Sequence, residues 1–282
     1  MAGRHSCKVV GAGTLSRSNS CPDRLRKWLR ERLAVQFATC EINLITAWQQ
    51  RVTPYLPERE VHRLLKSASR QPAFVADASG KTVPVSVTVS VCTRNRPEQL
   101  RECLKGLARM MPAADEILVV DNTSGDAAAE QLALEFGARY VREPKPGLSR
   151  ARNLAVAESS SEVVAFLDDD AVPDEKWLGM LLQPFADPQV STVTGSVVTP
   201  DAPPSEAKSP RTLSSRDPFW FVAACFGGLG LGSNMALRKS ACKGLTIFDV
   251  RLGRGAPFQI AEENYAFARL LSLGHTAVHV PA

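Results

Sequence analysis

The sequence lacks a long hydrophobic stretch of the kind that crosses a membrane. A spanning helix needs about 20 consecutive apolar residues. The apolar segment at residues 83–91 has the length of a strand and is interrupted by a proline and hydroxyl residues. The first seven residues, Met-Ala-Gly-Arg-His-Ser-Cys, also lack the apolar core of a signal peptide. We therefore expect a cytoplasmic protein without a transmembrane segment.

Paired cysteines are absent as well. The 7 cysteines are scattered, without the short spacings of a zinc site or a disulfide scaffold, so we expect reduced thiols. The chain is 44% hydrophobic and 22% charged, which is typical of a globular protein with a sizeable core. Its 282 residues allow one large domain with an appendage, or two modest domains.

Charge is unevenly distributed along the chain. Residues 1–80 hold 13 Lys and Arg against 6 Asp and Glu, a balance of +7, so the remaining 202 residues carry −2 of the total +5. A basic N-terminal part can contact anionic lipid, nucleic acid or an acidic protein, although such a face is more often simply solvated. We expect no nucleic-acid partner.

The first 82 residues divide into two parts. Residues 1–20, rich in Ser, Gly and Arg, predict a disordered tail. Residues 21–82 predict a small helical extension that begins with Pro22 and Asp23 in its first turn. Its apolar side chains recur on one helical face. The residues of that face are Leu25, Trp28, Leu29 and Leu33.

From residue 83 onward the periodicity changes. Valines at alternate positions from 85 to 91 predict a strand, and helix and strand patterns then alternate. This alternation predicts an α/β fold with a mainly parallel sheet and helices on both faces. The expected elements are a helix at 97–110, a strand at 116–120, a helix at 126–136, a strand at 138–141, a helix from near Ser149 and a strand at 162–167.

Three consecutive carboxylates, Asp168, Asp169 and Asp170, follow the last of these strands. Adjacent acids repel one another unless a cation or strong donors compensate, and hard oxygen ligands suit Mg²⁺ or Mn²⁺. In open α/β sheets, ligands bind in the crevice outside the carboxyl ends of the strands, where these acids would lie. The alternative is a solvated acidic loop ahead of a helix that starts near Pro173.

Several segments, in a fixed order, resemble the family 2 inverting nucleotide-sugar glycosyltransferases. They cover about residues 85–282. The segments are Val-Ser-Val-Cys-Thr-Arg-Asn-Arg-Pro (89–97), Glu-Ile-Leu-Val-Val-Asp-Asn (116–122), Arg-Glu-Pro-Lys-Pro-Gly-Leu-Ser-Arg-Ala-Arg-Asn (142–153), Phe-Leu-Asp-Asp-Asp (166–170), Gly-Ser-Asn-Met-Ala-Leu-Arg (232–238), Phe-Asp-Val-Arg-Leu-Gly (248–253) and Ala-Glu-Glu-Asn (261–264).

The resemblance implies a glycosyltransferase A-type fold in a catalytic domain at 83–282. It also implies a nucleoside-diphosphate sugar as donor, with UDP favoured, a sugar acceptor and a divalent metal, Mg²⁺ or Mn²⁺. Asp168 and Asp170 match the family's Asp-X-Asp pair and are expected to bind the metal. The acceptor hydroxyl or amine would belong to a small molecule or a glycoconjugate.

The donor-binding residues are carried over from the same motifs. Donors at the end of the first strand can meet a base and phosphates. Asp121 is similar to the family's acid that contacts the base or ribose, and Ser149 is expected to be an N-cap beneath a diphosphate. The full expected set is Thr93, Arg94, Asn95, Asp121, Asn122, Arg152, Asp168, Asp169, Gly232 and Asn234.

Glu262 and Glu263 are similar to the family's Glu-Asp pair. Inverting transfer needs a base to take the acceptor proton, and Glu263 aligns with it, with Glu262 in reserve. Acidic residues also simply favour a helix N-terminus. The family usually has Asp where this chain has Glu263, and often another Asp where Tyr265 stands. An added methylene moves the carboxylate by roughly a bond length, which can cost about 10²-fold in rate.

Two other hypotheses remain open. A nucleotidyltransferase would also place metal-binding acids after a parallel strand, but we would then expect a Gly-rich loop where this chain has Cys-Thr-Arg-Asn-Arg-Pro. The second is a catalytically weak member that binds nucleotide and recruits a partner through its basic helices. The sequence favours a metal-dependent inverting glycosyltransferase.

Overall fold

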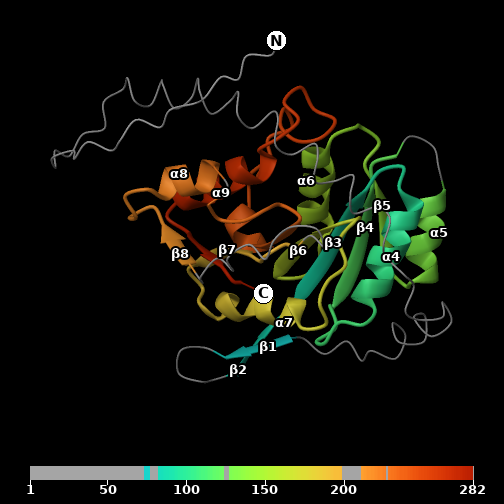
Figure 1. Cartoon of the computed structure of the whole chain (residues 1–282), viewed down its shortest axis with the longest axis horizontal. Helices are drawn as coiled ribbons and strands as arrows, with labels where there is room; N and C mark the ends of the chain where they lie inside the picture. Colours follow the sequence, from blue (N-terminus) through green and yellow to red (C-terminus); the bar gives the residue numbers. More distant parts are fainter. Residues whose placement is uncertain (1–72, 77–81, 124–126, 199–210, 227, 282) are drawn as a thin grey trace, which may run out of the picture. The chain divides into compact units, whose positions relative to one another are not determined.

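The computed structural model describes residues 73–76, 82–123, 127–198, 211–226 and 228–281 (Figure 1). All of them belong to one compact unit that spans Val52–Ala282. The expected disordered tail at 1–20 and the expected helices of the extension up to residue 72 lie outside the described residues and stay predictions. Within the described residues, no helix is long and apolar enough to cross a membrane.

An eight-stranded mixed sheet forms the centre of the fold, in the order β5-β4-β3-β6-β9-β7-β10-β8. The four strands β3 to β6 are mutually parallel, as predicted, whereas β9 runs antiparallel to both β6 and β7. The strands are β3 (Val87–Thr93), β4 (Glu116–Asp121), β5 (Arg139–Arg142), β6 (Val163–Asp168), β7 (Val190–Thr194), β8 (Arg211–Ser214), β9 (Asn234–Arg238) and β10 (Thr276–His279).

Helices cover both faces of this sheet. One apolar core joins the sheet to α4, α5 and α7, and a second core joins it to α6, α8 and α9. In Figure 1, α8 and α9 lie above the sheet and α7 lies below it. The helices are α4 (Pro97–Leu107), α5 (Ala128–Glu135), α6 (Leu148–Glu158), α7 (Trp177–Leu182), α8 (Trp220–Cys225) and α9 (Glu262–Ser272), with 3₁₀ turns η2 (Gln183–Ala186) and η3 (Lys239–Cys242).

Strand β4 shows why the central strands are apolar on both faces. Val119 belongs to one core, and its neighbours Leu118 and Val120 belong to the other. Successive side chains of a strand point to opposite faces, so a parallel sheet that is covered twice needs nearly continuous apolar strands. Polar residues of β3 are buried as well: Thr88 is 0% exposed and donates to Glu116 Oε2 over 2.6 Å.

A small antiparallel hairpin precedes the sheet, formed by β1 (Ala73–Ala76) and β2 (Thr82–Val85). The sequence did not lead us to expect a strand at Ala73–Ala76, within the range read as helical. A short apolar run cannot be assigned to strand or helix from periodicity alone. Val75 and Val85 are both 1% exposed within the core that contains α7, so packing against the domain stabilises the hairpin.

The register of the central strands gathers the site residues at one edge. Thr93 in β3 lies opposite Asp121 in β4, and Cys92 lies opposite Asp168 in β6. The three strands are parallel, so their carboxyl ends meet on the same side of the sheet. The acids, the first-strand loop and the second-strand acid therefore come together as the sequence predicted.

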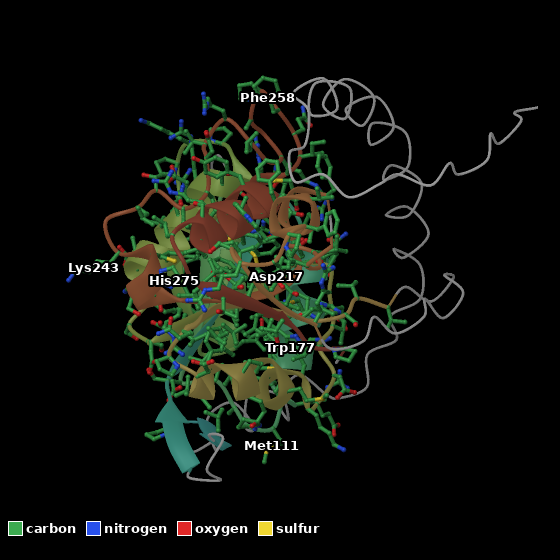
Figure 2. All side chains as sticks on the ribbon, turned by 90° about the vertical axis from the view of Figure 1, so that its left-hand side faces the viewer. Met111, Trp177, Asp217, Lys243, Phe258 and His275 are labelled. Atoms are coloured by element: carbon green, nitrogen blue, oxygen red, sulfur yellow. The ribbon has the colours of Figure 1, made fainter. Side chains whose placement is uncertain are left out.

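The buried aromatic Phe248 is expected to be a large contributor to stability. It is fully buried and packs edge to face against Phe166, with ring centroids 5.6 Å apart. Phe248→Ala should lower the free energy of unfolding by about 3–5 kcal/mol through lost burial and a cavity. Phe258→Ala is the matched control, because Phe258 is 64% exposed at the margin of the molecule (Figure 2) and should change stability by less than about 0.5 kcal/mol. Denaturant unfolding of both variants measures the difference, and equal losses would contradict the assigned core.

Candidate functional site

The three acids after β6 have different surroundings. Asp169 is turned inward, where it accepts hydrogen bonds from Thr93 Oγ1 at 2.8 Å and from Arg96 Nη1 at 3.2 Å. Asp168 and Asp170 keep a third of each side chain exposed, whereas the side chain of Asp169 is 8% exposed. Burial raises the pKa of Asp169 to about 6. The middle acid therefore anchors the loop, and the two outer acids are available to a ligand.

The outer acids suit a divalent cation that is shared with a substrate. Asp168 Oδ1 accepts from Arg152 and Asp170 Oδ2 accepts from Arg96, so among the described residues each carboxylate has one engaged oxygen and one left over. No group of three or more His, Cys, Asp or Glu side chains in the described part could hold a metal. Two carboxylates alone fit Mg²⁺ or Mn²⁺, which is often held by one or two carboxylates together with water and phosphate oxygens.

Asp121, at the end of β4, is fully buried and satisfied within the protein. Its Oδ1 accepts from the backbone N–H of Thr123 at 2.8 Å, and its Oδ2 accepts from the hydroxyl of Tyr140 at 2.9 Å. Burial, followed by the bond to the carboxylate, raises the pKa of Tyr140 to about 12. Asp121 is 0% exposed, so the expected contact with a base would require its carboxylate to become accessible.

Asn122 supports the loop that precedes α6. Its Nδ2 donates to the carbonyl oxygens of Glu143 and Lys145 at 2.9 and 2.8 Å, and its Oδ1 accepts from the N–H of Gly147 at 2.8 Å. These bonds use both ends of the amide. The side chain therefore fixes the path of residues 143–147 rather than facing a ligand in this arrangement.

The helix α6 begins differently from the expectation. Its N-cap is Gly147, at φ 138°, and Ser149 lies inside the first turn, so the prediction of Ser149 as N-cap was wrong. The hydroxyl of Ser149 instead donates to the carbonyl of Leu252 at 2.7 Å. Glycine tolerates this positive φ, which an N-cap serine would not readily adopt.

The same helix holds the segment 248–254. The amide of Asn153 makes two bonds to the backbone of Phe248, at 2.7 and 3.0 Å, and the N–H of Leu148 donates to the carbonyl of Arg254 at 2.9 Å. The segment then turns back beside the start of α6, where a Cβ on Gly255 would lie 3.3 Å from Gly147. One helix thus places a distant part of the chain next to the site.

The end of β3 supplies an exposed loop next to Gly255 and the start of α6. Thr93 is buried against Asp169, Asn95 adopts φ 56° and donates its N–H to Thr123 Oγ1 at 2.9 Å, and Arg94 is exposed. A Cβ on Gly255 would lie 3.4 Å from Arg94 Nη1. Arg94 therefore lies exposed beside the start of α6, where its guanidinium can meet an anion.

Arg152 joins the separate parts of the site. It is 2% exposed, and its Nη2 donates to Asp168 Oδ1 at 3.3 Å and to the carbonyl of Gly232 at 3.0 Å. Its Nη1 donates to Glu262 Oε1 at 2.9 Å. Burial lowers the pKa of Arg152, but the nearby carboxylates of Asp168 and Glu262 raise it, and the net result is a pKa above the usual arginine value. The strand that carries the acids and the helix that carries the two glutamates are therefore held by one guanidinium.

Glu262 and Glu263 open helix α9, as expected from their order in the sequence. Ala261 caps the helix at φ 71°, an unusual conformation for a residue with a Cβ. Glu262 is buried against Arg152, and Glu263 is half-buried. Burial, and then the negative charge of Glu262, raise the pKa of Glu263 to about 7. A carboxyl group with this pKa can exchange a proton near neutral pH.

Gly232 and Asn234 support the site from the start of β9. A Cβ on Gly232 would lie 2.7 Å from Arg152 Nη1, so a side chain at this position would displace the guanidinium. Asn234 accepts from the indole N–H of Trp177 at 2.8 Å and donates to the carbonyl of Ser196 at 2.8 Å. Both residues were expected to contact the donor, and in this structure they bind protein groups.

Sequence reasoning did not assign the contacts of several residues that order the site. Arg96 pairs with Asp169 and Asp170, Tyr140 covers Asp121, and Asn153 holds the 248–254 segment. Ser149 and Asn153 are four positions apart, so they share a helix face, and that spacing was the one available signal. The partners of Arg96 and Tyr140 are distant in sequence and could not be assigned from spacing.

The chain is similar to known glycosyltransferases. A family model described as "Glycosyl transferase family 2" matches residues 88–245, more than half of the chain. Glycosyltransferase AglE of Haloferax volcanii is 31% identical over 119 residues, which are 39% of each chain. Succinoglycan biosynthesis protein ExoM of Rhizobium meliloti is 35% identical over 139 residues, 46% of this chain and 43% of that one. The chain thus aligns with about two fifths of the length of these curated relatives.

Solved structures show the same fold. The mannosyltransferase PcManGT from Pyrobaculum calidifontis, solved with GDP-Man and Mn²⁺, has a TM-score of 0.53 at 20% identity and covers 89% of this chain and 66% of its own. Residues 1–349 of S. aureus TarS give a TM-score of 0.52 at 18% identity, covering 70% of this chain and 58% of that one. The fold is the glycosyltransferase A type, and on the family match the chain belongs to glycosyl transferase family 2.

Proposed function

We propose that this protein transfers a sugar from a nucleoside-diphosphate sugar to an acceptor hydroxyl or amine, with inversion at the transferred carbon. The observation that carries the proposal is the shared contact of Arg152 with Asp168 and Glu262. That contact brings the acids of the sheet edge close to the glutamates that open α9. A donor site and a proton acceptor within one substrate's reach are what such a transfer requires.

The donor diphosphate is assigned to the edge formed by β3, β4 and β6. Asp168 and Asp170 would hold a divalent cation, Mg²⁺ or Mn²⁺, whose charge stabilises the departing diphosphate. Arg94 lies exposed beside the start of α6, where its guanidinium can meet phosphate oxygens. The Mn²⁺ and GDP-Man of PcManGT, and the UDP-GlcNAc of TarS, support a nucleotide-sugar donor with a cation. UDP is the first nucleotide to test.

Glu263 is assigned as the base. It would take the proton from the acceptor hydroxyl while that oxygen forms a bond to the anomeric carbon. The bond from this carbon to the donor phosphate oxygen breaks in the same step, and its electron pair leaves with the nucleoside diphosphate. Attack opposite the leaving group inverts the carbon. A carboxyl pKa of about 7 matches general-base work near neutral pH.

Asp170→Asn tests the cation site, because the amide keeps the shape and removes the charge. We expect Mn²⁺-dependent binding of UDP or another nucleoside diphosphate to wild type, weakened at least about 10-fold in the variant, since charge-assisted contacts are the strong ones. Calorimetry with and without Mn²⁺ measures this. Asp174→Asn, an exposed acid four residues along, is the matched control and should bind like wild type. Nucleotide binding that is indifferent to both the cation and Asp170 would remove the proposed donor site.

The pH profile of transfer tests the base. The pKa of Glu263 lies above the ordinary carboxyl value, and the active form is the anion, so kcat/KM should fall about tenfold per pH unit below pH 7. Glu263→Gln should lower kcat by about 10²–10⁴-fold at pH 8 and leave nucleotide binding intact. The exposed Glu175→Gln is the control and should retain wild-type kcat.

Three results would contradict this assignment. A wild-type profile that stays flat down to pH 5 would exclude a base with the raised pKa. Full activity in Glu263→Gln would exclude Glu263 itself. Nucleotide binding by wild type without any transfer or donor hydrolysis would favour a binding protein over an enzyme.

A further inference from the structure

Arg152 has the contacts of a residue that orders the site from within. Its guanidinium reaches three chain segments at once: the end of β6 through Asp168, the loop before β9 through the carbonyl of Gly232, and the start of α9 through Glu262. These partners lie 16, 80 and 110 positions away in the sequence. The planar guanidinium group therefore links three segments that are far apart in the sequence.

The surroundings of Arg152 hold this group in one place. The rings of Phe166 and Phe248 lie 5.9 and 5.8 Å from the guanidinium carbon, within cation–π range. Gly232 leaves room for Nη1, and Gly253, at φ 89°, leaves room for the carboxyl group of Glu262, which would lie 3.1 Å from an added Cβ. Two glycines and two aromatic rings thus enclose one ion pair.

The burial of Arg152 argues against direct binding of the diphosphate, which its position in the sequence had suggested. The residue is 2% exposed, and protein oxygens accept its bonds. A phosphate would have to displace Asp168 or Glu262 from the guanidinium, or reach its remaining N–H groups in a residue that is 2% exposed. Leaving Glu262 buried without its partner would be costly, since breaking a buried ion pair typically costs about 3–5 kcal/mol.

We propose that Arg152 is a positioning residue that aligns the donor edge with the base, by tying Asp168 to Glu262 and so fixing the start of α9 that carries Glu263. Glu262 is the other partner in this contact, because its carboxylate accepts the hydrogen bond through which Arg152 holds the start of α9. This inference rests on the proposed function. It predicts that losing either partner misplaces Glu263 relative to the donor and slows the chemical step while donor affinity persists.

The test compares Arg152→Lys, Glu262→Gln and the double variant for kcat, donor KM and the Kd of a nucleoside diphosphate with Mn²⁺. Lysine keeps the charge and loses the planar guanidinium group. We expect each single variant to lower kcat by about 10²-fold, the effect of a misplacement near 1 Å, with donor KM and Kd changed less than about threefold. The double variant should be no slower than the worse single, because both changes break the same link.

Arg238→Lys is the matched control for burial of an arginine. Arg238 is 9% exposed, pairs with Glu162, donates to the carbonyls of Val190 and Phe185, and lies 5.3 Å from the ring of Phe185. It sits at the far end of β9, opposite Val163 at the start of β6, away from the acids. This variant should lower the unfolding temperature and keep kcat per folded molecule, which separates a structural loss from a positioning one.

Several results would overturn the proposal. A tenfold or larger rise in donor KM and Kd for Arg152→Lys, with kcat preserved, would make Arg152 a diphosphate ligand. A loss in Glu262→Gln equal to that in Glu263→Gln would make Glu262 the base, and additive losses in the double variant would show two independent roles. If Arg152→Lys does not fold, the kcat and KM of Glu262→Gln decide alone. A wild type that neither binds nucleotide nor transfers sugar would instead refute the proposed function.

Discussion

A buried positive charge among carboxylates is the constraint on which the arrangement of this site depends. Arg152 must be neutralised because an isolated buried charge is very costly, and Asp168 and Glu262 supply the compensation. Removing two charges from water is itself expensive, so a pair of this kind is weak evidence for stability. Its contribution here is to geometry, since the guanidinium of Arg152 joins the end of β6 to the start of α9.

The rest of the site follows from what surrounds that pair. Glycine occurs where Arg152 and Glu262 need space, at positions 232 and 253, and Phe166 and Phe248 form the apolar wall. Glu262 pairs with the arginine, and burial, followed by the negative charge of Glu262, raises the pKa of its neighbour Glu263 to about 7. Within this pair Glu262 raises the pKa of Glu263, whereas Arg152 lowers it, so burial and Glu262 together outweigh the arginine.

Much of the sheet edge that carries the three acids was predictable, because the patterns that define it lie within short stretches of sequence. The valines of β3, the apolar run of β6 and the acids that follow it define strands and their ends, and parallel pairing brings those ends together. The N-cap of α6 was predicted wrongly, because Gly147 and Ser149 are both plausible helix starts and the choice depends on Leu252, about a hundred residues away. The hairpin at Ala73–Ala76 was missed for a similar reason, since packing rather than periodicity makes it a strand.

The amino-acid sequence was sufficient for the fold class, for the order of strands and helices from β3 to β6, and for the family, because hydrophobic periodicity and motif order are written along the chain. The hydrogen-bond partners of the charged and amide side chains could not be predicted from periodicity or motif order. Asn122, Asn234 and Arg152 were expected to face a ligand, and in the folded chain they bind carbonyls, an indole and carboxylates of the protein. Those contacts join residues that are tens of positions apart in the sequence, and only the packing of the sheet and helices brings such residues together in space.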